Sequence, residues 1–366
     1  MSDDRLEPRV IHMPELAPGQ WLNVERPLTR EQLRGHVVLL DFWDYTCVNC
    51  TRTLPYVAAW SRRYAPLGLI VIGVHAPEFG FARLRAHVER AMAEHELTYP
   101  VVLDNEYQTW ERFAVKAWPT KVLVDPDGYI RGQWQGEGYY GEVERAIQTL
   151  LARQRPEAPL PPPMEPLRAE DAPGAVCYRP TAEVYAGIQG GGLFAGGLGN
   201  PAGYATLGPV VYELPPAAER EEGRFYLDGI WRAWPEAVAH AGQVGGVARL
   251  RYHAASVNAV LSPSADPVET LLDLGRTAEP IIEVRQDGRH LSRETAGADV
   301  VFDEAGRSLV RVTEPRLYQL ARNDRFEAHE LELIFRAAGL ALYSFSFTGC
   351  VVAPGRPGRE ETYTTR

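Results

Sequence analysis

Between residues 30 and 150, short apolar runs alternate with stretches in which apolar positions recur every three or four residues. Each run is nearly continuous, as expected of a strand that is buried on both faces of a sheet. The predicted strands cover residues 36–42, 67–74 and 121–124, and the predicted helices cover residues 50–64, 81–95, 107–113 and 141–153. This alternation predicts a three-layer α/β domain with a mainly parallel sheet.

The pattern changes in the second half of the chain, where short strands alternate apolar and polar side chains. These strands cover residues 247–253, 256–261, 281–286, 308–312, 331–335 and 342–347. Asp287-Gly288 supplies a turn after the third strand, and strands at this density favour a mainly-β, two-sheet jelly roll. Four aromatic residues could form a platform that stacks on sugars, although packing in the core is the commoner use: Tyr226, Trp231, Trp234 and Tyr252.

A proline-rich stretch separates the two patterns. Six prolines between residues 156 and 166 remove backbone donors and favour an extended, semi-rigid spacer. We predict a first domain over residues 1–154, a linker over residues 155–175 and a β-domain over residues 176–366. Residues 186–204 are dense in glycine but keep apolar side chains, which indicates a loop that packs on a surface or inserts into a cleft.

Composition and charge narrow the classes of function. A chain of 366 residues exceeds the size at which one core usually keeps growing, which favours two domains. The net charge of −10, without a run of Lys or Arg, argues against nucleic acid or an anionic membrane as partner. The N-terminus is acidic where a signal peptide is basic, and no apolar stretch reaches membrane-spanning length. We therefore expect a cytoplasmic protein, or an extracytoplasmic one if a leader or anchor was removed.

Two of the four cysteines, Cys47 and Cys50, lie in the sequence DYTCVNC, where the first predicted strand gives way to a helix. The start of a helix stabilises a thiolate, so Cys47 should have a lowered pKa and attack, while the more buried Cys50 should resolve the mixed disulfide. A zinc site would need further ligands at short spacing, and no phosphate-binding glycine motif is present. We expect no metal and no cofactor besides the redox-active disulfide.

Other residues stand at fixed spacings around this pair. Asp41 lies six residues before Cys47, Trp43 lies four before it, and Pro55 lies eight after it. Trp118-Pro119-Thr120 directly precedes the third apolar run. In this combination the chain resembles the thioredoxin-like thiol–disulfide oxidoreductases. The resemblance implies a buried carboxylate, an active-site tryptophan, a proline in the active-site helix and a cis-proline loop at these four places.

Two longer segments resemble branches of that superfamily. Residues 75–104 are similar to the helix-and-strand insertion of the TlpA branch. DFWDYTCVNCTRTLPY, followed by GVHAPEF, resembles the redox region of DipZ-type proteins, which implies a carbohydrate-binding-module-like β-domain after it. Thr53 departs from the Glu that many TlpA-like proteins carry there, so no proton-handling role is transferred to it. Val48 and Asn49 match neither thioredoxin nor strong oxidants, so the direction of electron flow stays open.

The resemblance implies exchange of disulfides with protein substrates and with a dithiol electron donor or acceptor. Asp41 would assist proton transfer, because a carboxyl on a buried strand should have a raised pKa. Four residues would bind the peptide, with core packing as the alternative for the two tryptophans: Trp43, Trp118, Pro119 and Thr120. Glu78 could be a second acid near the site, although we expect a solvated loop charge.

Two other functions stay open at this point. One is a redox-silent scaffold that binds a protein or glycan through the β-domain. The other is a thiol peroxidase, although Asp44 stands where the peroxide-binding pattern would need another residue. Cys177 and Cys350 lie near the two ends of the β-domain, and a jelly roll could bring them together. We nevertheless expect buried free thiols there, as in a cytoplasmic protein.

Overall fold

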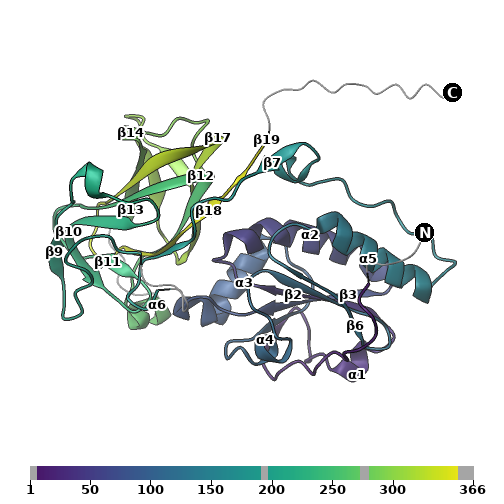
Figure 1. Cartoon of the computed structure of the whole chain (residues 1–366). Helices are drawn as coiled ribbons and strands as arrows, with labels where there is room; N and C mark the ends of the chain where they lie inside the picture. The colour runs from purple at the N-terminus through teal and green to yellow at the C-terminus, as the bar shows by residue number, and fades with distance from the viewer. Residues whose placement is uncertain (1–5, 191–196, 273–279, 353–366) are drawn as a thin grey trace, which may run out of the picture. The chain divides into compact units, whose positions relative to one another are not determined.

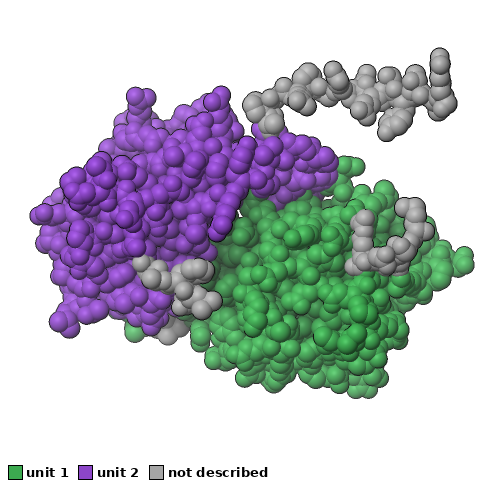
Figure 2. Space-filling view, viewed as in Figure 1, with its two compact units in different colours: residues 1–165, 262–276, 314–317 green, residues 166–261, 277–313, 318–366 purple. Residues whose placement is uncertain are grey.

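The computed structural model of the chain describes residues 6–190, 197–272 and 280–352 (Figure 1). These residues belong to two compact units, which are coloured separately in Figure 2. Unit 1 comprises residues 1–165, 262–276 and 314–317, and unit 2 comprises residues 166–261, 277–313 and 318–366. Within the described ranges, no helix is both long and apolar enough to cross a membrane.

Unit 1 contains a six-stranded sheet in the order β1-β4-β3-β2-β5-β6. Its strands are β1 (Gln20–Leu22), β2 (Val37–Trp43), β3 (Leu69–His75), β4 (Val101–Leu103), β5 (Thr120–Val124) and β6 (Ile130–Gln135). The pairings β2–β3 and β3–β4 are parallel, whereas β1–β4, β2–β5 and β5–β6 are antiparallel. The expectation of a mainly parallel sheet is therefore wrong. The chain turns back at Asp125–Gly128, so β6 forms a hairpin with β5.

Helices cover both faces of this sheet (Figure 1). They are α1 (Arg30–Leu33), α2 (Val48–Tyr64), α3 (Arg85–Glu94), α4 (Gln108–Arg112) and α5 (Tyr140–Gln154), with 3₁₀ turns at Ala65–Leu67 and Gly80–Arg83. In Figure 1, α2 and α5 lie on one side of the sheet, and α1 and α4 lie on the other. The single helix expected over residues 81–95 is divided at Leu84, whose backbone is extended. The arrangement is a thioredoxin-like fold.

The two faces of the sheet differ in chemistry. Alternate residues of β2, Val38, Leu40 and Phe42, enter an apolar cluster with side chains of β3 and β5. The intervening residues Asp41 and Trp43 point to the opposite face, because side chains alternate along a strand. A buried carboxyl therefore lies on the face of the sheet that α2 covers.

The first half of the proline-rich segment is fastened to unit 1. The side-chain amide of Gln148 in α5 donates to the carbonyl oxygen of Pro161 at 2.8 Å. The backbone N–H of Met164 donates to the carboxylate of Glu144 at 2.9 Å, and Tyr64 donates to the same carboxylate at 2.6 Å. The segment is thus held along α5 by contacts that an extended proline-rich chain cannot make within itself.

Unit 2 is mainly β. Its main sheet is an antiparallel network of β8 (Val184–Tyr185), β9 (Val210–Tyr212), β10 (Phe225–Ala233), β11 (Val238–His240), β12 (Gly246–Ser262), β13 (Ile281–Gln286), β14 (Arg289–His290), β15 (Val300–Phe302), β16 (Ser308–Arg311), β17 (Arg316–Phe335) and β18 (Ala341–Thr348). The first two predicted strands merge into β12, and residues 331–335 form the end of β17. The two-sheet jelly roll stays a prediction. Unit 2 also has 3₁₀ turns at Ala169–Asp171 and Ala217–Glu219. The short helix α6 (Pro267–Leu272) lies in the segment 262–276, which belongs to unit 1.

The aromatic residues of unit 2 pack mostly in its interior. Tyr226, Trp231 and Tyr252 are buried, with exposed fractions of 3%, 0% and 1%. Trp234 is half-buried, and the guanidinium carbon of Arg232 lies 4.3 Å from the centre of its ring. The core alternative is confirmed for the first three, so these four residues do not form a sugar-stacking platform.

The glycine-rich loop packs on unit 2 itself where it is described. Asn200 is buried; its side-chain amide donates to the Leu227 carbonyl at 2.9 Å, and its side-chain oxygen accepts from the Leu227 N–H at 2.7 Å. Leu198 is also buried, in the core cluster of unit 2. Residues 191–196 of the predicted loop lie outside the described residues.

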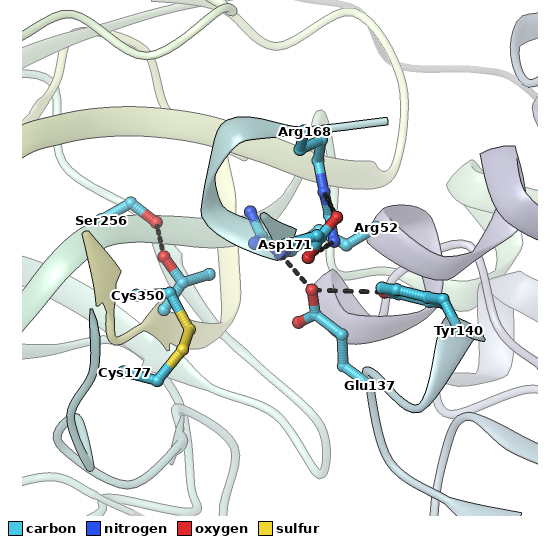
Figure 3. The surroundings of a disulfide bond; sticks show 9 residues. Arg52, Glu137, Tyr140, Arg168, Asp171, Cys177, Ser256 and Cys350 are labelled. Atoms are coloured by element: carbon cyan, nitrogen blue, oxygen red, sulfur yellow. Dashed lines mark hydrogen bonds and ion pairs between the residues drawn. A yellow bond between two sulfur atoms is a disulfide. The ribbon is translucent and has the colours of Figure 1, made fainter. Parts of the chain in front are cut away.

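A separate two-stranded sheet carries a disulfide bond. In it, β7 (Ala175–Cys177) pairs antiparallel with β19 (Cys350–Val352), and Cys177 stands directly opposite Cys350. The two residues are joined by a disulfide, with their Cα atoms 3.9 Å apart (Figure 3). The expectation of buried free thiols is therefore wrong: Cys177 is exposed and Cys350 half-buried. Antiparallel pairing brings the two side chains within bonding reach, although 173 residues separate them in sequence.

Candidate active site

The Cys47/Cys50 pair occupies the junction between β2 and α2. Cys47 is the N-cap residue of α2, and its sulfur accepts a hydrogen bond from the Cys50 N–H at 3.2 Å. The two Sγ atoms lie 2.6 Å apart, and no disulfide bond joins them. Cys47 is partly exposed, whereas Cys50 is fully buried. Cys47 is therefore the sulfur that a substrate can reach.

Asp44 holds the loop before Cys47 in place. One oxygen of its buried carboxylate accepts from the Thr46 N–H at 2.7 Å and from the Thr46 hydroxyl at 2.8 Å. The other oxygen accepts from the backbone N–H of Glu78. The Glu78 carboxylate lies 3.4 Å from the Thr46 hydroxyl and is half-buried, so the expectation of a solvated loop charge is wrong. These contacts tie the cysteine loop to the segment that follows β3.

A second buried acid, Asp41, lies behind the cysteines. It is fully buried, and within the described part of the chain neither carboxylate oxygen has a hydrogen-bond partner. Burial raises the pKa of Asp41 from its ordinary 3.8 to about 6, and the charge of Lys121 opposes that rise. Burial also raises the pKa of Cys50 well above its usual value, and the nearby Asp41 charge contributes to that rise. Asp41 is thus suited to exchange a proton with Cys50.

Lys121 is a residue of this site that sequence reasoning missed. It stands opposite Asp41 in the pairing of β5 with β2 and is fully buried. Its ammonium group donates to the Gly136 carbonyl at 3.2 Å. The available signal was a charged residue inside an apolar strand, KVLV, whose charge needs a buried partner.

His75 is a second residue that sequence reasoning missed. It ends β3, is fully buried, and has a pKa that burial lowers, so it is neutral near pH 7. Its ring lies edge-on to Trp43, with centroids 5.1 Å apart, and stacks on Tyr45 at 5.7 Å. Trp43 is also fully buried, which matches the core-packing alternative for this tryptophan and not a place in an open groove.

The loop of Trp118, Pro119 and Thr120 lies at the start of β5. The Trp118–Pro119 peptide bond is cis, and the Trp118 indole N–H donates to the Ala76 carbonyl at 3.0 Å. Pro119 and Thr120 are buried, and the Thr120 hydroxyl donates to the Ala117 carbonyl at 2.7 Å. Of the three side chains, only that of Trp118 is partly exposed. Pro119 and Thr120 therefore form the buried part of this loop.

A partly exposed acid, Glu137, approaches the start of α2 from the segment before α5. Arg52 donates to its carboxylate at 2.7 Å, and the Tyr140 hydroxyl lies 3.5 Å from the same oxygen (Figure 3). The Tyr140 hydroxyl also lies 3.5 Å from the hydroxyl of Thr53, the position where many TlpA-like proteins carry a Glu. The negative charge beside this turn of α2 is thus that of Glu137, from the segment before α5. Throughout the described residues, no three His, Cys, Asp or Glu side chains are grouped to hold a metal ion.

Comparison with known proteins divides the chain in a similar way. Residues 17–133 match the AhpC/TSA family, and residues 181–348 match the family described as "Thioredoxin like C-terminal domain". Protein DipZ of Mycobacterium bovis is 30% identical over 329 residues, which cover 89% of this chain and 41% of DipZ. The chain thus spans about two fifths of the length of that relative.

Two shorter proteins match less than half of the chain. The thiol-disulfide oxidoreductase YkuV of Bacillus subtilis is 30% identical over 142 residues, which cover 38% of this chain and 94% of YkuV. The solution structure of a thioredoxin-like protein in the oxidized form shares 30% sequence identity. It covers 39% of this chain and 95% of that protein, with a TM-score of 0.36.

Proposed function

Because the chain belongs to the family of thioredoxin-like thiol–disulfide oxidoreductases, we propose that it exchanges disulfides with protein substrates through Cys47 and Cys50. One observation carries the proposal. A partly exposed sulfur at the start of a helix lies 2.6 Å from the sulfur of a fully buried thiol. The helix N-terminus stabilises the Cys47 thiolate, and the buried Cys50 is protected from reacting with other molecules. The Cys47/Cys50 pair itself carries the electrons, as a dithiol when reduced and as a disulfide when oxidised, so the proposal needs no other cofactor.

The reaction is written here in the direction of substrate reduction. The Cys47 thiolate attacks one sulfur of a substrate disulfide; the substrate S–S bond breaks, and the released sulfur takes a proton. The Cys50 thiolate then attacks Cys47 in the mixed disulfide and releases the second substrate thiol. A Cys47–Cys50 disulfide remains, and two electrons have passed to the substrate.

Asp41 accepts the Cys50 proton in this scheme. Cys50 must ionise before it attacks, yet burial raises its pKa well above the usual value. With a pKa of about 6, Asp41 is mostly ionised near pH 7 and able to take the proton. The substrate peptide would lie beside Trp118, whose side chain is partly exposed, while Trp43, Pro119 and Thr120 support the loop.

Reduction of insulin by the reduced protein tests the proposal. Cys47→Ser should abolish the activity, because it removes the attacking sulfur. Cys50→Ser should instead accumulate a mixed disulfide with the substrate, which non-reducing electrophoresis detects. Undiminished reduction of insulin by Cys47→Ser would refute the proposed function.

The reduction potential of the Cys47/Cys50 couple, measured against glutathione, decides the direction of electron flow. A value of about −270 mV would make the protein a reductase, and a value of about −120 mV would make it an oxidant. Val48 and Asn49, between the cysteines, are the residues to exchange if the value is to be shifted.

A thiol peroxidase is the second candidate, because the match to the AhpC/TSA family covers the cysteine pair. The structure offers a reason against it: the Asp44 carboxylate, three residues before Cys47, is saturated with hydrogen bonds from Thr46 and Glu78. A peroxide oxygen would have to approach beside this negative charge. Rapid consumption of hydrogen peroxide by the reduced protein, lost in Cys47→Ser, would favour the peroxidase.

Unit 2 is assigned an interaction role, as a jelly-roll module that presents a protein or glycan partner to the redox unit. The Cys177–Cys350 disulfide favours work in an extracytoplasmic compartment, because such bonds persist where the surroundings are oxidising. Alkylation of thiols in intact cells tests the compartment. Labelling of Cys177 and Cys350 without prior reduction would place the protein in the cytoplasm.

A further inference from the structure

The chain uses lysine sparingly. Of its 38 Lys and Arg residues, only Lys116 and Lys121 are lysines. Lys116 is exposed, whereas Lys121 is fully buried on the sheet. Arginine stays charged wherever it is placed, but a buried lysine readily changes its proton affinity. One of the two lysines thus occupies a fully buried position on the sheet, in a chain whose other cationic side chains are almost all arginines.

The sheet places Lys121 beside the proton acceptor of the proposed reaction. Lys121 stands opposite Asp41 in the antiparallel β2–β5 pair, so the two side chains share one face of the sheet. Within the described residues the Asp41 carboxylate accepts no hydrogen bond, so its charge depends on neighbouring charges. The Lys121 ammonium is anchored by the Gly136 carbonyl at 3.2 Å.

Several titratable groups face this pair. Cys47 and Cys50 approach from the start of α2, Tyr99 from the segment before β4, and Glu137 from the segment after β6. Burial lowers the pKa of Lys121, whereas the charges of Asp41, foremost, and of Cys50, Glu137 and Cys47 raise it. Lys121 in turn lowers the pKa of Asp41 against the effect of burial. The two groups therefore stabilise each other's charged forms.

We propose that Lys121 is a positioning residue for proton transfer, whose ammonium group keeps the Asp41 carboxylate ionised beneath Cys50. This rests on the proposed thiol–disulfide exchange. In the resolving step the Cys50 proton passes to Asp41 while the Cys47–Cys50 bond forms and the bond from Cys47 to the substrate sulfur breaks. The leaving substrate sulfur becomes a thiolate and takes a proton from water, and Lys121 keeps its own proton throughout.

The two lysines allow a direct test by NMR. Full-length protein labelled with [ε-¹³C]lysine gives one signal from Lys116 and one from Lys121, assigned with Lys116→Met. The Lys121 signal should titrate below about 10.4 and move to still lower pH in Asp41→Asn, because the carboxylate that favours its charge is lost. The Lys116 signal should not move between the two proteins. A Lys121 titration that is the same in the wild type and in Asp41→Asn would overturn the inference.

A kinetic test follows the resolving step itself. A mixed disulfide between Cys47 and a thiol reporter is prepared, and release of the reporter by Cys50 is followed against pH. In Lys121→Met the midpoint should rise by about 1 unit, because Asp41 loses its counter-charge. From a midpoint of about 6, release should then slow about twofold at pH 7 and roughly tenfold at pH 5. Lys116→Met is the matched control and should leave the profile unchanged. An unshifted midpoint in folded Lys121→Met would contradict the inference.

The two proposals fail separately. If Cys47→Ser still reduces insulin, the proposed function is wrong, whatever the lysine signals show. If Cys47→Ser is inactive but Lys121→Met resolves the mixed disulfide with the wild-type pH profile, only the role of Lys121 is wrong. If Lys121→Met does not fold, the NMR comparison of the wild type with Asp41→Asn decides the question.

Discussion

The protein has two pairs of cysteines, and the structural environments of the two pairs differ. Cys47 and Cys50 are three positions apart in sequence, are not joined by a disulfide, and lie near buried titratable groups at the start of a helix. Cys177 and Cys350 are 173 residues apart, form a disulfide, and face each other across a two-stranded sheet. The first pair has the buried Asp41 carboxyl near it, and the second joins two segments of chain. The surroundings, not the sulfur atoms, separate reactive from structural cysteines.

The largest expected difference between the pairs is in activity. Cys47→Ser should lower insulin reduction by a factor on the order of 10³, because no other sulfur can form the mixed disulfide. The double variant Cys177→Ser/Cys350→Ser, assayed under the same conditions, should keep the wild-type rate. A comparable loss of activity in the double variant would show that the second pair also exchanges electrons. It would contradict the division into a reactive pair and a structural pair.

The next largest effect is on the stability of unit 2. Removing the disulfide with Cys177→Ser/Cys350→Ser should lower the free energy of unfolding by about 3 kcal/mol, because the bond closes a very long loop. Urea unfolding without reductant measures the change. Cys50→Ser serves as the control for loss of a cysteine and should leave the unfolding of unit 2 unaltered. Equal midpoints for the double variant and the wild type would refute a structural role.

Asp41 should make the redox unit less stable while it supports the reaction. Its folded pKa of about 6 lies above the ordinary 3.8, so the folded state binds the proton more tightly than the unfolded state. The resulting stability is present below pH 3.8 and is lost as the pH rises through 6. Asp41→Asn should therefore stabilise unit 1 by about 3 kcal/mol at pH 7 and by little at pH 4.

Urea unfolding of Asp41→Asn at several pH values checks this expectation. The same variant should resolve the mixed disulfide more slowly, so stability and activity should change in opposite directions. A variant that is no more stable than the wild type at pH 7 would mean that the buried carboxylate is compensated by its surroundings.

The smallest effect concerns a charge pair next to the reactive cysteines. The side chains of Arg52 and Glu137 are 20% and 22% exposed and lie 2.7 Å apart. Arg52→Ala should cost about 0.5 kcal/mol of unfolding free energy, and less at high salt, as for other partly exposed ion pairs. Thermal unfolding at low and high salt measures both effects. A loss of unfolding free energy as large as that from removing the disulfide would show that contacts near Cys47 and Cys50 also contribute strongly to stability.

Local signals explain why much of the redox unit was predicted. The apolar run of β2, the cysteine spacing, Pro55 within α2 and the segment of Trp118 each act over a few residues. Edge strands were harder: β6 contains Arg131 and Gln133, so it lacks the continuous apolar run by which β2 was recognised. The same reliance on apolar runs led to the expectation of parallel strands, since a buried antiparallel strand such as β5 has the same composition.

The buried polar residues of the site were harder to predict from the sequence than the cysteines. Lys121 is the second residue of β5 and His75 is the last residue of β3, and a polar residue near the end of an apolar run usually marks the boundary of the strand. Their importance depends on the strand beside them: β2 brings Asp41 opposite Lys121 and Trp43 opposite His75. That pairing is a long-range property, because three α-helices and two other strands lie between β2 and β5 in the chain.

The sequence by itself determined where the candidate reactive thiol lies, because a strand end, a helix start and the Cys47/Cys50 spacing are local properties of the chain. Only the tertiary structure decided which groups surround that thiol and which cysteines are joined. Burial of Asp41, its pairing with Lys121 and the Cys177–Cys350 bond all require distant segments to meet. Proton affinity and disulfide formation depend on distances of a few ångströms, and strand pairing sets those distances.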